Sequence, residues 1–208
     1  DRYFMRNALN ISLRGIGNTW PNPSVGAVVV KNDQIVSRGW TQPGGKPHAE
    51  VVALKKNNLF GATLYTTLEP CSHYGKTPPC VDQIIKSKIN RVVIGLKDPN
   101  PKINGEGIRK LKKKKIKVTI GVLQKEIKKI HSGFFYNIKK KKPFIASKIA
   151  ISKNGKMINQ NKEWITSEVS RKYGNFLRAK YDAIITSINT VLGDNPLLNC
   201  RHCGMENL

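Results

Sequence analysis

The chain has 208 residues, 39% of them hydrophobic, and a formal net charge of +24. This composition is that of a folded globular protein and excludes a disordered or fibrous chain. No segment approaches the ~20 apolar residues that a membrane span needs, and the amino-terminal stretch lacks the apolar centre of a signal peptide. We therefore expect a cytoplasmic protein, in which the cysteines are more often metal ligands or core residues than disulfides.

The positive charge has two explanations. A strongly basic chain can bind nucleic acid, because lysines that neutralise phosphates release counterions. Here the basic excess is mostly lysine, and isoleucine and asparagine are also abundant, which is the bias that AT-rich coding produces. The runs Lys112 to Lys115 and Lys139 to Lys142 lie between apolar segments, where solvated loops and helix faces are expected. We favour a compositional origin and expect no nucleic-acid partner.

Apolar periodicity divides the first ~130 residues into alternating helices and strands. Helices are predicted at 3–13, 49–56, 81–87, 107–115 and 124–131. Strands are predicted at 25–30, 35–37, 63–67, 91–96 and 118–122, the first two forming a hairpin. This order predicts an α/β sandwich in which helices cover a sheet.

The lysine run 139–142, closed by Pro143, predicts a linker, because it cannot be buried and proline disfavours helix continuation. We therefore divide the chain into a first domain at 1–138, a basic linker at 139–143 and a second unit at 144–208. In the second unit we predict two strands and one helix, at 144–151, 183–186 and 167–180. About 65 residues are few for an independent α/β domain, so we expect this unit to be incomplete.

The chemistry is carried by His48, Cys71 and Cys80, with a proline before each cysteine. One imidazole nitrogen and two thiolates give a zinc ion three protein ligands and leave its fourth tetrahedral position for water, as a catalytic site requires. Both ligand segments open predicted helices, and a helix amino terminus favours a thiolate over a thiol. We therefore predict that one zinc ion binds to these three residues.

Glu50 is the predicted catalytic residue. A carboxylate two residues from a ligand can reach the zinc water without binding the metal, accept its proton, and return protons to a ring nitrogen and a leaving amine. Together these residues form the signature of zinc-dependent deaminases. In the alternative, His48 and the two cysteines are ordinary buried residues. The order of the elements and their position at predicted strand-to-helix junctions favour the deaminase interpretation.

The spacing of the two cysteines separates this chain from the deaminases with a PCxxC motif, because the eight residues SHYGKTPP lie between Cys71 and Cys80. Four segments closely resemble the deaminase half of the bifunctional riboflavin-biosynthesis deaminase/reductases, namely PNPSVG at 21–26, EPCSH at 69–73, GKTPPC at 75–80 and DPNP at 98–101. The resemblance covers essentially the whole chain. It implies a cytidine-deaminase-like three-layer sandwich followed by the start of a dihydrofolate-reductase-like domain.

The resemblance also implies the substrate, 2,5-diamino-6-ribosylamino-4(3H)-pyrimidinone 5′-phosphate, whose 2-amino group is hydrolysed. His73, Lys76 and Thr77 in the insert would then offer hydrogen bonds and positive charge to the phosphate. In the alternative, Lys76 is a solvated loop lysine. No other partner is expected beyond a second copy of the chain, since the resemblance implies a homo-oligomer.

Three further residues match substrate contacts of the family. Asn22 corresponds to an asparagine that contacts the ring, and Asp98 and Asn100 correspond to residues on the ribose side. In the alternative, all three are turn residues of proline-rich stretches. Thr41 departs from the pattern, because the family usually has a histidine there, and a hydroxyl cannot supply positive charge.

Residues beyond the linker resemble the start of the reductase half, which uses NADPH to reduce the ribose of the deaminated product to ribitol. By matching position, the NADPH contacts are Ala150, Trp164, Thr190 and Asp194. The substrate contacts are Lys162, which replaces a more common serine, with Arg178, Leu198 and Arg201. In the alternative, Trp164 and Leu198 are core residues and Arg178 is an exposed helix residue. We expect the chain as given to deaminate without reducing, with impaired NADPH binding.

Two other functions would also account for the zinc ligands. A tRNA or nucleobase deaminase would share the zinc signature and suit the positive charge, but the long cysteine spacing and the reductase motifs argue against it. A catalytically silent binding protein would keep zinc as a structural ion with a fourth protein ligand. Glu50 and the three-ligand set argue against that function.

Overall fold

The computed structural model describes residues 1–75, 77–100, 103–157 and 164–201. Lys76 and Lys162 therefore lie outside the described residues. The chain divides into two compact units, Asp1–Phe144 and Ile145–Leu208. In the described part of the chain, no helix is long and apolar enough to cross a membrane.

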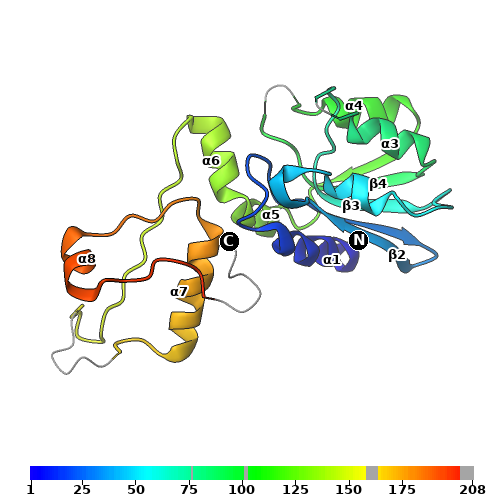
Figure 1. Cartoon of the computed structure of the whole chain (residues 1–208). Helices are drawn as coiled ribbons and strands as arrows, with labels where there is room; N and C mark the ends of the chain where they lie inside the picture. Colours follow the sequence, from blue (N-terminus) through cyan, green and yellow to red (C-terminus); the bar gives the residue numbers. More distant parts are fainter. Residues whose placement is uncertain (76, 101–102, 158–163, 202–208) are drawn as a thin grey trace. The chain divides into compact units, whose positions relative to one another are not determined.

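The first unit is built on a five-stranded sheet in the order β2-β1-β3-β4-β5 (Figure 1). Strand β1 pairs antiparallel with both β2 and β3, while β3, β4 and β5 run parallel to one another. The bounds are β1 Gly26–Lys31, β2 Gln34–Trp40, β3 Thr63–Leu68, β4 Arg91–Leu96 and β5 Lys117–Ile120. The carboxyl ends of β3 and β4 therefore lie at the same edge of the sheet, which is where open α/β sheets bind ligands.

The β1–β2 hairpin closes through Asn32 and Asp33, which both adopt positive φ angles of 50° and 54°. A two-residue turn of this kind needs left-handed backbone, and Asn and Asp adopt it more readily than other residues with a side chain. The turn sets the register in which Lys31 pairs with Gln34. The predicted hairpin is thus confirmed.

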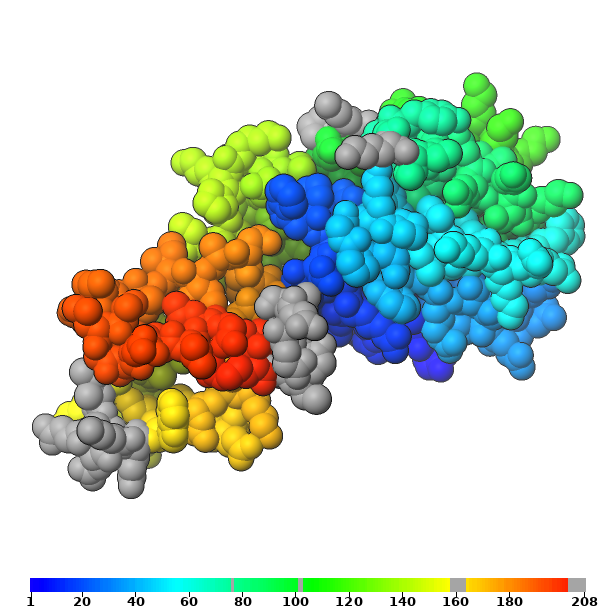
Figure 2. All heavy atoms as spheres, viewed as in Figure 1, coloured from blue at the N-terminus to red at the C-terminus, as the bar shows by residue number. Residues whose placement is uncertain are grey.

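Helices cover both faces of the sheet and make three layers (Figure 1). α1 contacts β1 and β3 and α5 contacts β4, whereas α2, α3 and α4 pack side by side on the opposite face. The bounds are α1 Arg2–Ser12, α2 Ala49–Ala53, α3 Cys80–Lys86, α4 Glu106–Lys113 and α5 Gln124–Ile130, with 3₁₀ turns at Leu13–Gly15 and Pro43–Gly45. In the space-filling view, side chains of the first unit close the spaces that the ribbon leaves between sheet and helices (Figure 2). The predicted α/β sandwich is confirmed.

The segment predicted as a linker begins within a helix. A further helix, α6 Ser132–Lys140, follows α5, so the first two lysines of the run are helical. The helix forms because Phe135 packs into the core, with Phe134 partly buried against it. Tertiary burial of one apolar face is what stabilises a short helix of this kind.

The second unit contains α7 Glu168–Lys180 and α8 Ile188–Asp194. The predicted helix at 167–180 is confirmed, with Ser167 as its N-cap accepting a hydrogen bond from the Ser170 amide. The two predicted strands, 144–151 and 183–186, are wrong, because neither segment pairs with another strand in the described part of the chain. Apolar, β-branched residues favour a strand, but a strand also needs a partner to accept and donate its backbone hydrogen bonds.

Candidate metal centre and active site

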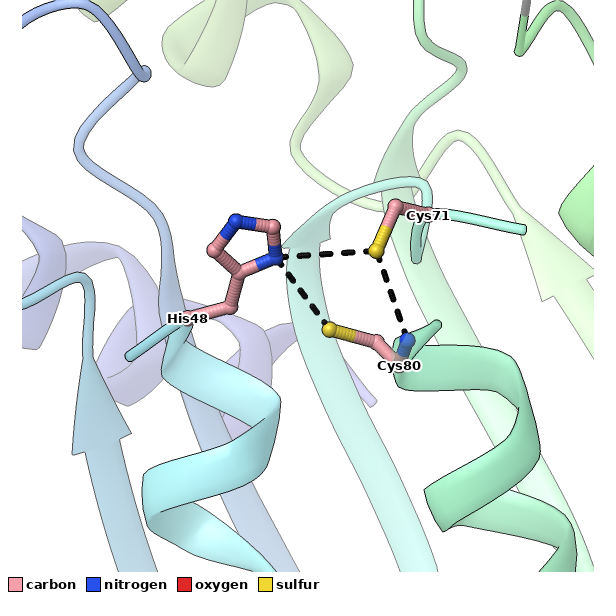
Figure 3. A group of neighbouring side chains, drawn as sticks. All are labelled: His48, Cys71 and Cys80. Atoms are coloured by element: carbon pink, nitrogen blue, oxygen red, sulfur yellow. Dashed lines mark hydrogen bonds between the residues drawn. The ribbon is translucent and has the colours of Figure 1, made fainter. Parts of the chain in front are cut away.

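Three side chains from separate segments meet at the carboxyl edge of β3 (Figure 3). His48 is the N-cap of α2, Cys71 follows β3, and Cys80 is the first residue of α3. Pro79 occupies the N-cap of α3, one position before the first helical position at which prolines are most common. The structure therefore brings the three predicted zinc ligands together.

The distances within this group suit a tetrahedral zinc ion. The Nδ1 atom of His48 lies 3.3 Å from the Cys80 sulfur and 3.6 Å from the Cys71 sulfur. A tetrahedral ion with ligands at ~2.0–2.3 Å separates its ligand atoms by about 3.4–3.8 Å. The three donor atoms lie within 4.8 Å of one another, and no fourth Cys, His, Asp or Glu joins them among the described residues. The residues present thus fit a zinc ion that retains one open position.

The group favours a thiolate at Cys71. The pKa of Cys71 falls to about 4, chiefly because its sulfur accepts a hydrogen bond from the Cys80 thiol, with His48 adding to the effect. The backbone amide of Cys80, at the start of α3, also donates to this sulfur over 3.3 Å. Cys71 in turn raises the pKa of Cys80 and, by hydrogen bonding, that of His48. One helix amino terminus therefore stabilises the charge of the neighbouring ligand, which favours metal binding.

Glu50 lies in the first turn of α2, two residues after His48, and is buried. Burial raises its pKa, while the charge of His48 lowers it. Thr66, on the adjacent strand β3, donates a hydrogen bond to Oε1 of Glu50 over 3.2 Å. Thr66 did not emerge from the sequence as a functional residue, although a polar residue inside a buried strand is a signal that could have found it.

Two other loops carry residues that the sequence predicted to contact the substrate. Asn22 is half-buried and its side-chain amide donates to the carbonyl of Gly45 over 2.9 Å, in the loop that leads to His48. Asp98 is buried after β4, and burial raises its pKa to about 6. It accepts a hydrogen bond from the backbone amide of Asn100 over 2.8 Å. Hydrogen bonds within the protein therefore hold both of these loops in place.

Thr41 has a structural position. Its side chain is buried, and its hydroxyl accepts a hydrogen bond from the Val25 amide over 2.9 Å. The Thr41 amide donates back to the Val25 carbonyl, so this residue ties the end of β2 to the start of β1. His73 and Thr77, in the loop between the two cysteines, are exposed and free to approach a ligand from solvent.

The sequence matches two family models. Residues 1–96 match the cytidine and deoxycytidylate deaminase zinc-binding region, and residues 143–207 match the RibD C-terminal domain. The riboflavin biosynthesis protein RibD of Aquifex aeolicus is 44% identical over 99% of this chain, and that of Escherichia coli is 42% identical over 97%. The chain belongs to the RibD family. It spans 59% of the Aquifex RibD and 55% of the Escherichia RibD.

A solved RibD structure has the same fold. The crystal structure of the diaminohydroxyphosphoribosylaminopyrimidine deaminase/5-amino-6-(5-phosphoribosylamino)uracil reductase of Thermotoga maritima matches with a TM-score of 0.91 at 43% identity. The match covers 98% of this chain and 60% of the Thermotoga chain. The resemblance to the bifunctional riboflavin-biosynthesis deaminase/reductases is thus confirmed, and the tRNA-deaminase alternative is not favoured.

Three residues matched to the reductase substrate of RibD lie together in the second unit. Arg178 on α7 donates to the carbonyls of Leu197 and Asn199 over 2.8 and 3.0 Å. Arg201 donates to the same Leu197 carbonyl over 2.8 Å, and Leu198 between them is half-buried. The two guanidinium groups therefore converge on one short stretch of chain.

The residues matched to the NADPH contacts of RibD are less closely grouped. Trp164 is 77% exposed and stacks under the guanidinium of Arg171 at 4.9 Å, so it is not a core residue here. Thr190 and Asp194 lie on α8, and Ala150 is half-buried in the segment without regular secondary structure that precedes α7. Within the described part of the chain, no hydrogen bond joins any of these four residues to another.

Proposed function

We propose that the first unit is a zinc-dependent deaminase that hydrolyses the 2-amino group of 2,5-diamino-6-ribosylamino-4(3H)-pyrimidinone 5′-phosphate. The convergence of His48, Cys71 and Cys80 beside the buried carboxylate of Glu50 carries this proposal. Thiol ligands persist in a reducing compartment, so we place the reaction in the cytoplasm. As the family resemblance implies, we propose a homo-oligomer.

Zinc, when bound, supplies Lewis acidity that lowers the pKa of water to near neutral values. The chain supplies the proton transfers. Glu50 accepts one proton from the attacking water and delivers it to the ring nitrogen, then accepts the second proton from the same oxygen as it becomes the carbonyl and delivers it to the departing amine. Its buried position suits both directions of transfer, because burial raises its pKa toward neutrality.

Thr66 and the substrate loops supply orientation. The hydrogen bond from Thr66 orients the carboxylate of Glu50 through Oε1 and leaves Oε2 for proton transfer in this proposal. We assign Asn22 to the pyrimidine ring, Asp98 and Asn100 to the ribose side, and His73, Lys76 and Thr77 to the phosphate. A charged and hydrogen-bonding loop between the two cysteines suits a phosphorylated substrate.

The second unit belongs to a reductase domain in RibD. We propose that Arg178, Leu198 and Arg201, with Lys162, contact the phosphorylated substrate of that domain. The convergence of the two arginines supports this assignment, because guanidinium groups bind phosphate through paired N–H donors. We assign Ala150, Trp164, Thr190 and Asp194 to NADPH on the family resemblance.

The Glu50→Gln variant tests the deaminase. Glutamine keeps the oxygen that accepts from Thr66 but cannot transfer protons, so kcat for ammonia release should fall by about 10²- to 10⁴-fold. Zinc content should remain that of the wild type, because Glu50 is not a ligand. Glu126→Gln, the same change at a half-exposed site on α5 that pairs with Arg6, serves as the matched control and should leave kcat unchanged. Ammonia release by Glu50→Gln at the wild-type rate would refute the mechanism.

A further inference from the structure

Glu69 is a buried carboxylate that the mechanism above does not use. It lies at the end of β3, two residues before Cys71, and its side chain is 3% exposed. Its Oε2 atom accepts hydrogen bonds from the amides of Asp98 and Gly105 over 3.2 and 3.1 Å, and Oε1 accepts from the amide of Ile108 over 3.3 Å. Three backbone donors from another part of the chain therefore converge on one side chain.

These donors belong to the loop after β4 and to the start of α4. Gly105 is the N-cap of α4 in a left-handed conformation with φ of 89°, and Ile108 lies in the first turn. The first amides of a helix lack partners within the helix, and its amino terminus favours a negative charge. Glu69 thus caps α4 from a distant strand. The remaining donor is the backbone amide of Asp98, and the side chain of Asp98 accepts a hydrogen bond from the amide of Asn100.

The chain around Cys71 also touches α4 directly. A Cβ atom added to Gly107 would lie 2.3 Å from the carbonyl oxygen of Pro70, so only glycine allows this approach. On the other side of Cys71, the carbonyl of Ser72 accepts a hydrogen bond from the side chain of Lys110 over 2.7 Å. The ligand segment is therefore held against α4 at each end.

We infer that Glu69 is a positioning residue that sets the distance between the Cys71 ligand segment and the substrate loop at 98–100. The inference rests on the proposed function, because that function assigns the metal to one segment and the ribose contacts to the other. Glu69 touches neither the zinc position nor the substrate; it acts through Asp98 and Asn100 and through α4.

The test compares Glu69→Gln with wild-type enzyme. A glutamine retains one acceptor oxygen, but its NH₂ group faces an amide donor, so at least one of the three backbone bonds is lost. The substrate loop then moves away from the metal while the ligands stay in place. We expect kcat/KM to fall about tenfold, which equals about 1.4 kcal/mol, mainly through KM. The zinc content and the kcat should stay within about twofold of wild type.

Glu106→Gln is the matched control. It removes a carboxylate from the first turn of the same helix, but that carboxylate is half-exposed and forms its salt bridge with Arg109 of α4. It should leave kcat/KM unchanged. Gly107→Ala disturbs the packing of α4 against Pro70 while Glu69 stays intact. This variant should reproduce the rise in KM even if Glu69→Gln does not fold.

A double-mutant cycle with Asn100→Ala separates positioning from general destabilisation. If Glu69 acts through the substrate loop, Glu69→Gln should raise KM far less in the Asn100→Ala background than in wild type. Fully additive effects on KM, or a Glu69→Gln enzyme with wild-type kcat/KM, would overturn the inference while leaving the deaminase proposal intact. A wild-type enzyme that releases no ammonia would instead overturn the proposed function.

Discussion

His131 makes a quantitative prediction about acid sensitivity. The residue lies between α5 and α6 and is 4% exposed, and its Nε2 atom has no hydrogen-bond partner within the described residues. Its ring meets Phe135 edge to face at 6.0 Å. Burial lowers the pKa of His131 from 6.5 to about 4, because the charged ring would lose its hydration without gaining a partner.

Burial of the neutral ring makes the folded state less stable in acid. In the unfolded chain His131 takes up a proton near pH 6.5, whereas in the folded state it stays neutral until about pH 4. Acid therefore favours the unfolded chain. The contribution is close to zero at pH 8 and grows as pH falls through 6.5 toward about 4. At pH 5 the free energy of unfolding is lower by about 2 kcal/mol than at pH 8, and the full loss is about 3 kcal/mol.

The measurement is urea unfolding of wild type and His131→Phe at pH 8 and pH 5. Phenylalanine preserves the ring contact with Phe135 and cannot be protonated. The free energy of unfolding of the variant should therefore fall by about 2 kcal/mol less than that of wild type between pH 8 and pH 5. Other groups cancel in the difference, including Asp98, whose raised pKa acts in the opposite direction. The exposed His73 provides the control, and His73→Asn should follow wild type. Parallel losses in wild type and His131→Phe would refute the reasoning.

Three further predictions concern the first unit. Cys80→Ser should lose zinc, measured by metal analysis, and lower Tm, because loss of a ligand removes binding energy from the folded state; retained stoichiometric zinc would contradict the assignment. Thr41→Val should cost about 1–3 kcal/mol of unfolding free energy by leaving the buried Val25 amide without its acceptor, with KM unchanged. Lys76→Ala should reduce kcat/KM about 10- to 150-fold for the phosphorylated substrate only, and equal losses on the dephosphorylated substrate would exclude a phosphate contact.

The sequence predicted the first unit well where local and tertiary signals agree. The apolar run of β1, for instance, is flanked by turn residues, and the structure buries it on both faces. The three ligands were also predictable, because zinc restricts both residue type and chain order. Their convergence follows from the parallel pairing of β3 and β4 and from the helices that begin at the same edge.

The remaining features depend on partners that the sequence does not reveal. In the sequence, Glu69 is only the first residue of the EPCSH motif. Its three amide donors come from residues 29 to 39 positions later. The segments 144–151 and 183–186 have strand-like composition, but no local signal states whether a neighbouring strand exists. For α8, Ser187 accepting from the Thr190 amide is a local cap signal that could have been recognised.

The ligand spacing has a consequence for the chain as a polymer. His48 and Cys71 are 23 positions apart and Cys71 and Cys80 are 9 apart, so one ion closes two loops at once. Closing loops in the folded state costs chain entropy, which ion binding must offset. The population of folded molecules should therefore follow the supply of the ion: each tenfold rise in free zinc above its Kd adds about 1.4 kcal/mol to the folded state. Zinc starvation would deplete this enzyme through unfolding as well as through lost catalysis.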